Sequence, residues 1–234
     1  MVSIQENVEK TLQKIDSAAK KYNKNPNNIQ LLAVSKTKPI SNIQAAIDSG
    51  LTQFGENYVQ EGIEKVQFFA DKNNQLTWHL IGPIQSNKTR LIAEHFDWVH
   101  SIERSKIAQR LNDQRPHTHK PLQVLIQVNT SAEASKSGLS SANQKEIIAL
   151  ADEITQLPNL TLRGLMCIPE PSDDFATQLA AFTPLTALFA ELKTRYSQFD
   201  TLSMGMSDDM EAAIASGSTM VRVGSAIFGA RNYG

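Results

Sequence analysis

The sequence is poor in several features that mark whole classes of protein. Its single cysteine, Cys167, excludes an internal disulfide and is typical of a reducing compartment. Lysine and arginine number 23 against 24 acidic residues, so the net charge of -1 gives no field that attracts nucleic acid or an anionic membrane. The N-terminal segment MVSIQENVEKTLQK lacks an apolar signal-peptide core, and no uncharged apolar run is long enough to cross a bilayer. We therefore expect a soluble, cytoplasmic protein without nucleic-acid or membrane partners.

Motifs of common enzyme classes are missing as well. The chain has no GxGxxG turn of dinucleotide-binding sheets and no GxSxG elbow of serine hydrolases. No Cys, His and acidic residues have the spacing of a metal site, so we expect no metal. His117 and His119 lie in the polar segment RPHTHKP, which is typical of a loop. His79 lies in an apolar run and is interpreted as a hydrogen-bonded core residue.

What the sequence does contain is one alternation repeated along its length. Apolar residues at helical spacing predict an amphipathic helix over residues 3–22. Short β-rich runs then alternate with turns and helical patterns, the longest from Phe175 to Tyr196 with a kink or late start at Pro184. The predicted strands are residues 29–34, 51–55, 76–82, 97–102, 122–129, 160–166, 200–204 and 219–224.

Strands that alternate with helices predict parallel pairing through right-handed crossovers. Eight such units without a linker favour a closed (β/α)8 barrel over an open doubly wound sheet. We expect residues 1–234 to form this one α/β domain, with the first helix as an addition. The functional site of such a barrel lies at the carboxyl ends of its strands.

Lys36 follows the first predicted strand, in the segment LLAVSKTKP. It alternates with Leu32 and Val34, so an inward face would place its ammonium group at the barrel mouth. A lysine that is partly desolvated there is a candidate nucleophile towards a carbonyl compound. The alternative is a solvated or salt-bridged lysine at a strand end. Lys38, next to Pro39, is interpreted as an ordinary turn residue.

The last two turns of the predicted barrel are candidates for a phosphate site. Gly224 and Ser225 lie between the last strand and a short helix, where backbone N–H groups are available to an anion. Ser207 follows the seventh strand and is a second candidate. The alternative for Ser207 is a helix cap, with Asp208 and Glu211 completing a capping box.

Arg222 and Asn57 complete the set of candidate residues. Arg222 shares its strand face with Met220 and Gly224, so it either points outward to acidic residues of a helix or places a cation inward beside a ligand. Asn57 has no signal beyond its position at a strand end. An amine and an anion site at one barrel mouth suit pyridoxal 5'-phosphate, whose aldehyde needs a lysine and whose phosphate needs N–H donors.

Several segments resemble the pyridoxal phosphate homeostasis proteins, the YggS/PROSC family. They are LLAVSKTKP, FGENYVQE, WHLIGPIQSNK, RGLM and SMGMSDDMEAAIASGSTMVRVGSAIFGAR, and the resemblance runs from residue 29 to the C-terminus. It implies a barrel similar to the N-terminal domain of alanine racemase, with Lys36 as the Schiff-base lysine. It further implies that Asn57 lies beside the cofactor and Arg222 faces the pyridine nitrogen. Ser207, Gly224 and Ser225 would then hold the phosphate.

The family is regarded as cofactor-binding and regulatory, buffering pyridoxal phosphate and affecting amino-acid and 2-oxo-acid balance without an established catalytic activity. We therefore expect a monomeric carrier or buffer in vitamin B6 homeostasis, with apo pyridoxal-phosphate enzymes as possible recipients. Two alternatives stay open. One is an amino-acid racemase or lyase, for which Tyr58 is the only tyrosine near a strand end. The other is a phosphate-ester enzyme in which Lys36 is a general base.

Overall fold

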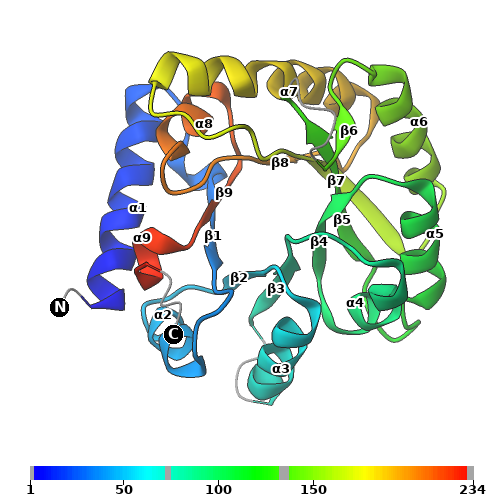
Figure 1. The fold of residues 1–234 in the computed structure, drawn as a ribbon, viewed down its shortest axis with the longest axis horizontal. Helices are drawn as coiled ribbons and strands as arrows, with labels where there is room; N and C mark the ends of the chain where they lie inside the picture. Colours follow the sequence, from blue (N-terminus) through cyan, green and yellow to red (C-terminus); the bar gives the residue numbers. More distant parts are fainter. Residues whose placement is uncertain (1–2, 72–74, 132–136, 231–234) are drawn as a thin grey trace.

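The computed structural model describes residues 3–71, 75–131 and 137–230. Its centre is a barrel of parallel strands surrounded by helices (Figure 1). The barrel strands are β1 (Gln30–Val34), β2 (Gln53–Glu56), β3 (Thr77–Leu80), β4 (Trp98–Ile102), β5 (Leu122–Asn129), β7 (Leu160–Met166), β8 (Thr201–Ser203) and β9 (Met220–Val223). All eight coincide with predicted strands, and β5 and β7 have the predicted bounds.

The strand pairings close the barrel into a ring. β1 lies between β2 and β9, and the pairing of β4 with β5 joins the two halves of the sheet. The predicted (β/α)8 barrel is therefore confirmed. One further strand, β6 (Leu139–Ser140), pairs with the end of β5 and was not predicted, because two residues are too few for a periodic pattern.

The α-helices are α1 (Ile4–Lys21), α2 (Ile40–Asp48), α3 (Val59–Ala70), α4 (Thr89–His95), α5 (Ser105–Gln114), α6 (Gln144–Thr155), α7 (Phe175–Arg195), α8 (Met210–Ser216) and α9 (Ser225–Phe228). Two short 3-10 turns, η1 (Pro26–Asn28) and η2 (Ser86–Lys88), precede β1 and α4. The predicted N-terminal helix is confirmed as α1, which Ser3 and Glu6 begin with a capping box. The late start at Pro184 is wrong, because α7 runs through this proline with buried Phe182 and Leu185 on either side.

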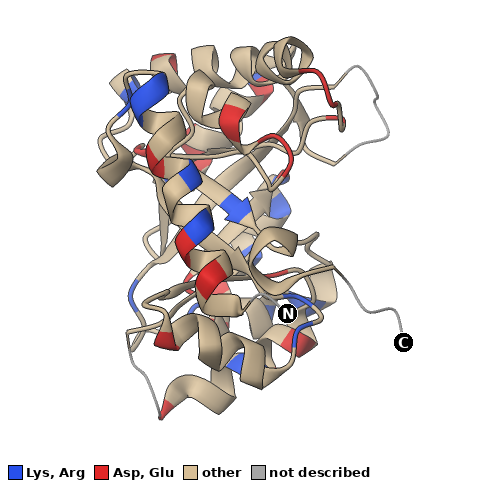
Figure 2. Cartoon of the chain, turned by 90° about the vertical axis from the view of Figure 1, so that its left-hand side faces the viewer, with Lys and Arg blue, Asp and Glu red and all other residues tan. Residues whose placement is uncertain are grey.

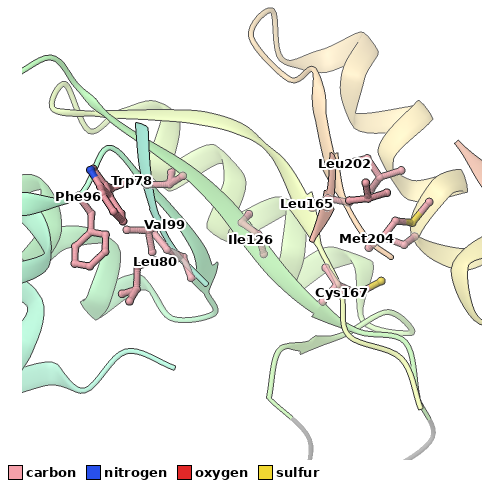
Figure 3. Close-up of a cluster of buried hydrophobic side chains, with 14 of the residues drawn as sticks. Trp78, Leu80, Phe96, Val99, Ile126, Leu165, Cys167, Leu202 and Met204 are labelled. Atoms are coloured by element: carbon pink, nitrogen blue, oxygen red, sulfur yellow. The ribbon is translucent and has the colours of Figure 1, made fainter. Parts of the chain in front are cut away.

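The hydrophobic core fills the space between the strands and the surrounding helices. Figure 3 shows two parts of it, one around Trp78 and Phe96 and the other around Leu165 and Leu202. These side chains are at most 4% exposed, and each fully buried large apolar side chain contributes about 1.5–3 kcal/mol. The packed core fixes the strands, and hence the loops at their carboxyl ends.

α7 is long and apolar enough to cross a membrane by length and composition alone. Core helices of barrels pass the same test, and α7 has five buried residues packed into the core. Charged residues of both signs are scattered over the helices in Figure 2. We therefore treat α7 as a barrel helix.

Candidate functional site

The carboxyl ends of the strands surround a cavity of ≈ 270 Å³. All six predicted site residues line it: Lys36, Asn57, Ser207, Arg222, Gly224 and Ser225. They follow or belong to β1, β2, β8 and β9, so the barrel brings together residues that are up to 189 positions apart (225 − 36). The structure thus assembles one site from them, and their binding roles stay predictions.

Lys36 lies two residues beyond β1. The strand face that it continues points into the barrel, because Val34 on that face lines the cavity and Leu32 pairs with Arg222 of β9, which lines it too. The Lys36 side chain is half-buried and lines the cavity together with Val34. The next residue, Thr37, has a φ of 61°, a left-handed conformation that is unusual for a β-branched residue. A side chain of this exposure at a barrel mouth suits a reactive amine.

Asn57 directly follows β2 and has an unsatisfied polar atom. Its Oδ1 is buried and has no hydrogen-bond partner among the described residues. Such an atom normally finds a partner, so this oxygen is available to a donor group of a ligand. Gly82 packs against the Asn57 backbone, where a Cβ would lie only 2.2 Å from the Asn57 carbonyl oxygen. A glycine is therefore needed at position 82 to keep Asn57 in place.

The two candidate serines meet in the cavity lining. Ser225 Oγ donates to Ser207 Oγ at 3.2 Å, although Ser207 lies between β8 and α8 and Ser225 begins α9. Gly224 lies against β1, where a Cβ would be 3.2 Å from the Val34 carbonyl oxygen. The capping-box alternative for Ser207 is wrong, because α8 begins at Met210 and its N-cap residue is Asp209.

Arg222 points inward, so the outward ion-pair alternative is wrong. It is 3% exposed, and its guanidinium donates to Ser203 Oγ at 2.8 Å and to the Cys167 carbonyl oxygen at 2.9 Å. Burial lowers the pKa of Arg222, but a guanidinium stays protonated in proteins. The cavity wall therefore contains a permanent cation that only donates hydrogen bonds.

Behind Arg222, a chain of buried hydrogen bonds crosses the barrel. Gln53 Oε1 only accepts, so a neutral His79 donates to it from Nε2 at 2.8 Å and accepts at Nδ1 from His100 Nε2 at 2.9 Å. His100 Nδ1 is then an acceptor for the Ser203 hydroxyl at 3.0 Å, and Ser203 Oγ also accepts from Arg222 at 2.8 Å. The tautomers of both rings thus follow from the placement of the Gln53 amide oxygen.

Both imidazoles in this chain are neutral. Burial lowers the pKa of His79 to about 3. Burial lowers the pKa of His100 well below its ordinary value, and repulsion from the Arg222 cation, and from any proton on His79, acts in the same direction. The interpretation of His79 as a hydrogen-bonded core residue is confirmed.

Sequence reasoning missed two groups around the site. Ser203 and His100 gave no local signal, because their partners lie on other strands. Lys38 is more than a turn residue: it lines the cavity. Its ammonium donates to the carbonyl oxygens of Phe228, Gly229 and Ala230 at 3.0–3.3 Å. It therefore ties the loop after β1 to the end of α9.

The family model described as "Alanine racemase, N-terminal domain" matches residues 7–232. The pyridoxal phosphate homeostasis protein of Vibrio alginolyticus is 60% identical over 235 residues, covering 100% of both chains. The chain belongs to the pyridoxal phosphate homeostasis protein family. The resemblance stated from the sequence motifs is thus confirmed.

Solved structures agree with this family assignment. PipY of Synechococcus elongatus with pyridoxal phosphate bound is similar with a TM-score of 0.78 and 35% identity, covering 97% of this chain and 100% of that chain. Alanine racemase from E. faecalis is similar with a TM-score of 0.69 and 17% identity, covering 99% of this chain and 59% of that chain. The second comparison supports the barrel fold alone. The chain thus spans a whole family member, but only part of a racemase.

Proposed function

We propose that this protein binds pyridoxal 5'-phosphate as a Schiff base on Lys36 and acts as a carrier or buffer in vitamin B6 homeostasis. The observation that supports this most is the meeting of Lys36, Arg222 and the Ser207–Ser225 pair in one cavity. The names of its relatives and the ligand of PipY point the same way.

The residues of the cavity fit this cofactor group by group. Lys36 would hold the cofactor through its aldehyde carbon, with C=N replacing C=O and one water released. Ser207 and Ser225 offer hydroxyl donors to the phosphate, with the backbone of Gly224 beside them. Arg222 offers donors to the ring nitrogen, and the buried Oδ1 of Asn57 supplies an acceptor beside the ring. When bound, the cofactor supplies an electrophilic aldehyde and an electron-withdrawing ring.

The charges at the site favour holding the cofactor over catalysis. A buried guanidinium disfavours protonation of a ring nitrogen that faces it, and this weakens the ring as an electron acceptor. Among the described residues that line the cavity, the titratable ones are Lys36, Lys38, Asp208 and Arg222. Tyr58, considered as a second acid or base, is 57% exposed and absent from this lining.

The mouth of the cavity also suits loading and release. Ile168 is 44% exposed and Met206 is 37% exposed, and both line it. Protected carbanion chemistry generally needs a site that excludes water. We therefore propose that the protein is not an enzyme and that apo pyridoxal-phosphate enzymes receive its cofactor. A cytoplasmic location, a monomer and a single domain over residues 1–234 stay predictions.

The covalent assignment has a direct test. Purified protein is loaded with excess pyridoxal phosphate, reduced with borohydride and digested, and the modified peptide is identified by mass spectrometry. We expect one adduct on Lys36, absent from Lys36→Ala and present in Lys106→Ala, which changes an exposed lysine on α5. Colourless wild type without an adduct would refute the proposal and favour the phosphate-ester alternative.

A second measurement separates carrier from enzyme. The loaded protein is mixed with an apo pyridoxal-phosphate enzyme in the presence of a trap for free cofactor, and recipient activity is followed. Cofactor transfer that persists while the trap removes free cofactor supports delivery by direct contact between the two proteins. Turnover of an amino acid at ordinary enzyme rates, lost in Lys36→Ala, would instead favour the racemase or lyase alternative.

A further inference from the structure

A buried ion-pair cluster contacts the residues on either side of Lys36, and we call residues 35–37 the Lys36 loop. It consists of Glu56 at the end of β2 and of Glu61 and Lys65 on α3, and we call it the Lys65 cluster. The side chains of Glu56 and Lys65 are 0% and 5% exposed, and that of Glu61 is 28% exposed. None of the three lines the cavity, so none is expected to touch a ligand there.

The Lys65 ammonium uses all three of its donors. It donates to Glu56 Oε1 at 2.8 Å, to Glu61 Oε1 at 2.6 Å and to the backbone carbonyl oxygen of Ser35 at 2.7 Å. Ser35 is held a second time, because its Oγ donates to Glu56 Oε1 at 2.5 Å. The residue before Lys36 is thus fixed by two contacts to buried charged groups.

The residue after Lys36 is held by the same cluster. The backbone N–H of Thr37 donates to Glu61 Oε1 at 2.6 Å. Thr37 is also the residue whose φ is 61°. An unfavourable backbone conformation persists only where surrounding contacts determine it, and here a carboxylate supplies such a contact. Both peptide groups that flank Lys36 are therefore anchored to α3.

Helix stability alone does not explain the Lys65 cluster. A buried ion pair costs desolvation that apolar residues of similar volume avoid, so stability alone would favour an apolar pair here. α3 already packs through Ile63 and Phe69. What apolar side chains could not do is hold the carbonyl group of Ser35 and the N–H group of Thr37 at the same time.

We propose that Glu61 and Lys65 are positioning residues that hold the Lys36 loop in its binding conformation before the cofactor arrives. This inference rests on the proposed function, because it concerns how the lysine meets its ligand. A loop that is ordered in advance loses less entropy on binding, so the cluster raises cofactor affinity without touching the cofactor.

The test uses three variants of α3. Glu61→Ala removes the acceptor of the Thr37 N–H group, and Glu61→Gln keeps an oxygen there without the charge. Glu64→Ala is the matched control, since Glu64 is an exposed glutamate on the same helix. For each we measure cofactor affinity by titration, the hydrogen-exchange rate of the Thr37 amide in cofactor-free protein, and the unfolding midpoint.

Loss of a hydrogen bond to a charged group is expected to weaken cofactor binding in Glu61→Ala by about tenfold to a hundredfold. The Thr37 amide should exchange faster by a similar factor, Glu61→Gln should recover most of both effects, and Glu64→Ala should match wild type. An unfolding midpoint lowered in Glu61→Ala, with unchanged affinity and unchanged Thr37 exchange, would make the cluster purely structural and overturn the proposal.

The exchange measurement needs no cofactor, so the two proposals fail separately. If wild type takes up no cofactor but its Thr37 amide is protected and Glu61→Ala releases it, the proposed function fails and the anchoring stands. An unprotected Thr37 amide in wild type overturns the anchoring, whatever the cofactor does.

Discussion

Mild acid should destabilise this protein through the imidazoles buried in its barrel. His79 has its pKa lowered from 6.5 to about 3, so the folded protein keeps it neutral where the unfolded chain binds a proton. Stability therefore falls as pH falls between these two values, and this contribution is flat above pH 7. The difference of about 3.5 units corresponds to about 5 kcal/mol in full, of which about 2 kcal/mol is lost by pH 5. His100 adds a loss of the same sign.

The measurement is a series of urea unfolding curves between pH 7 and pH 4.5. Wild type is compared with His79→Gln, whose amide can accept from His100 and donate to Gln53 as the imidazole does. The slope of unfolding free energy against pH should be smaller in the variant by up to about 1.4 kcal/mol per pH unit, the value for one proton. His119→Gln, which changes an exposed loop histidine, is the control.

The comparison of variants is needed because other groups have the opposite effect. Burial raises the pKa of Glu56 and of Asp97, so these carboxyl groups take up protons first in the folded protein and oppose the loss in acid. The difference between wild type and His79→Gln removes their contribution. Equal slopes in wild type and His79→Gln would refute the reasoning, since the pKa of His79 would then be the same in the folded and the unfolded chain.

Two other predictions concern the cavity. Ser207→Ala combined with Ser225→Ala should weaken pyridoxal phosphate binding by roughly tenfold or more, because the hydroxyl pair is proposed to hold the phosphate. Binding of phosphate-free pyridoxal should be unchanged; parallel titrations check this, and equal losses for both ligands would contradict it. Gly82→Ala should lower the unfolding free energy by roughly 1–3 kcal/mol, since its Cβ would lie 2.2 Å from the Asn57 carbonyl oxygen. It should also weaken cofactor binding, because Asn57 would move; an unchanged urea midpoint would contradict the close contact.

The barrel could be predicted from the sequence because each buried strand is a short apolar run bounded by turn residues. β5 and β7 are the clearest cases, with long runs that are nearly all buried. The start of α7 was less certain because Pro184 lacks an N–H group, and it is packing on both sides that keeps the helix continuous. The local sequence pattern therefore predicts strands more accurately than it predicts where helices begin and end.

The candidate site could be predicted in part for a related reason. Lys36, Gly224 and Ser225 lie at strand ends, and the barrel rule alone selects them. Glu61 and Lys65 lie four residues apart on α3, but the contact of Lys65 with Ser35 and the chain from Ser203 to Gln53 join residues of different elements, which no window of sequence contains. Such supporting groups become visible only in three dimensions.

The pairing of β1 with β9 has a consequence for the newly made chain. Lys36 follows the first barrel strand and Ser225 follows the last, so the cavity is incomplete until these two strands meet. A nascent chain exposes its lysine long before it has the groups proposed to hold the phosphate. Because the long-range pairing of terminal strands is a late and slow event in folding, stable capture of a ligand should report that synthesis and ring closure are finished. Lys36 would then hold no ligand stably in a chain that is shorter or whose barrel is still open.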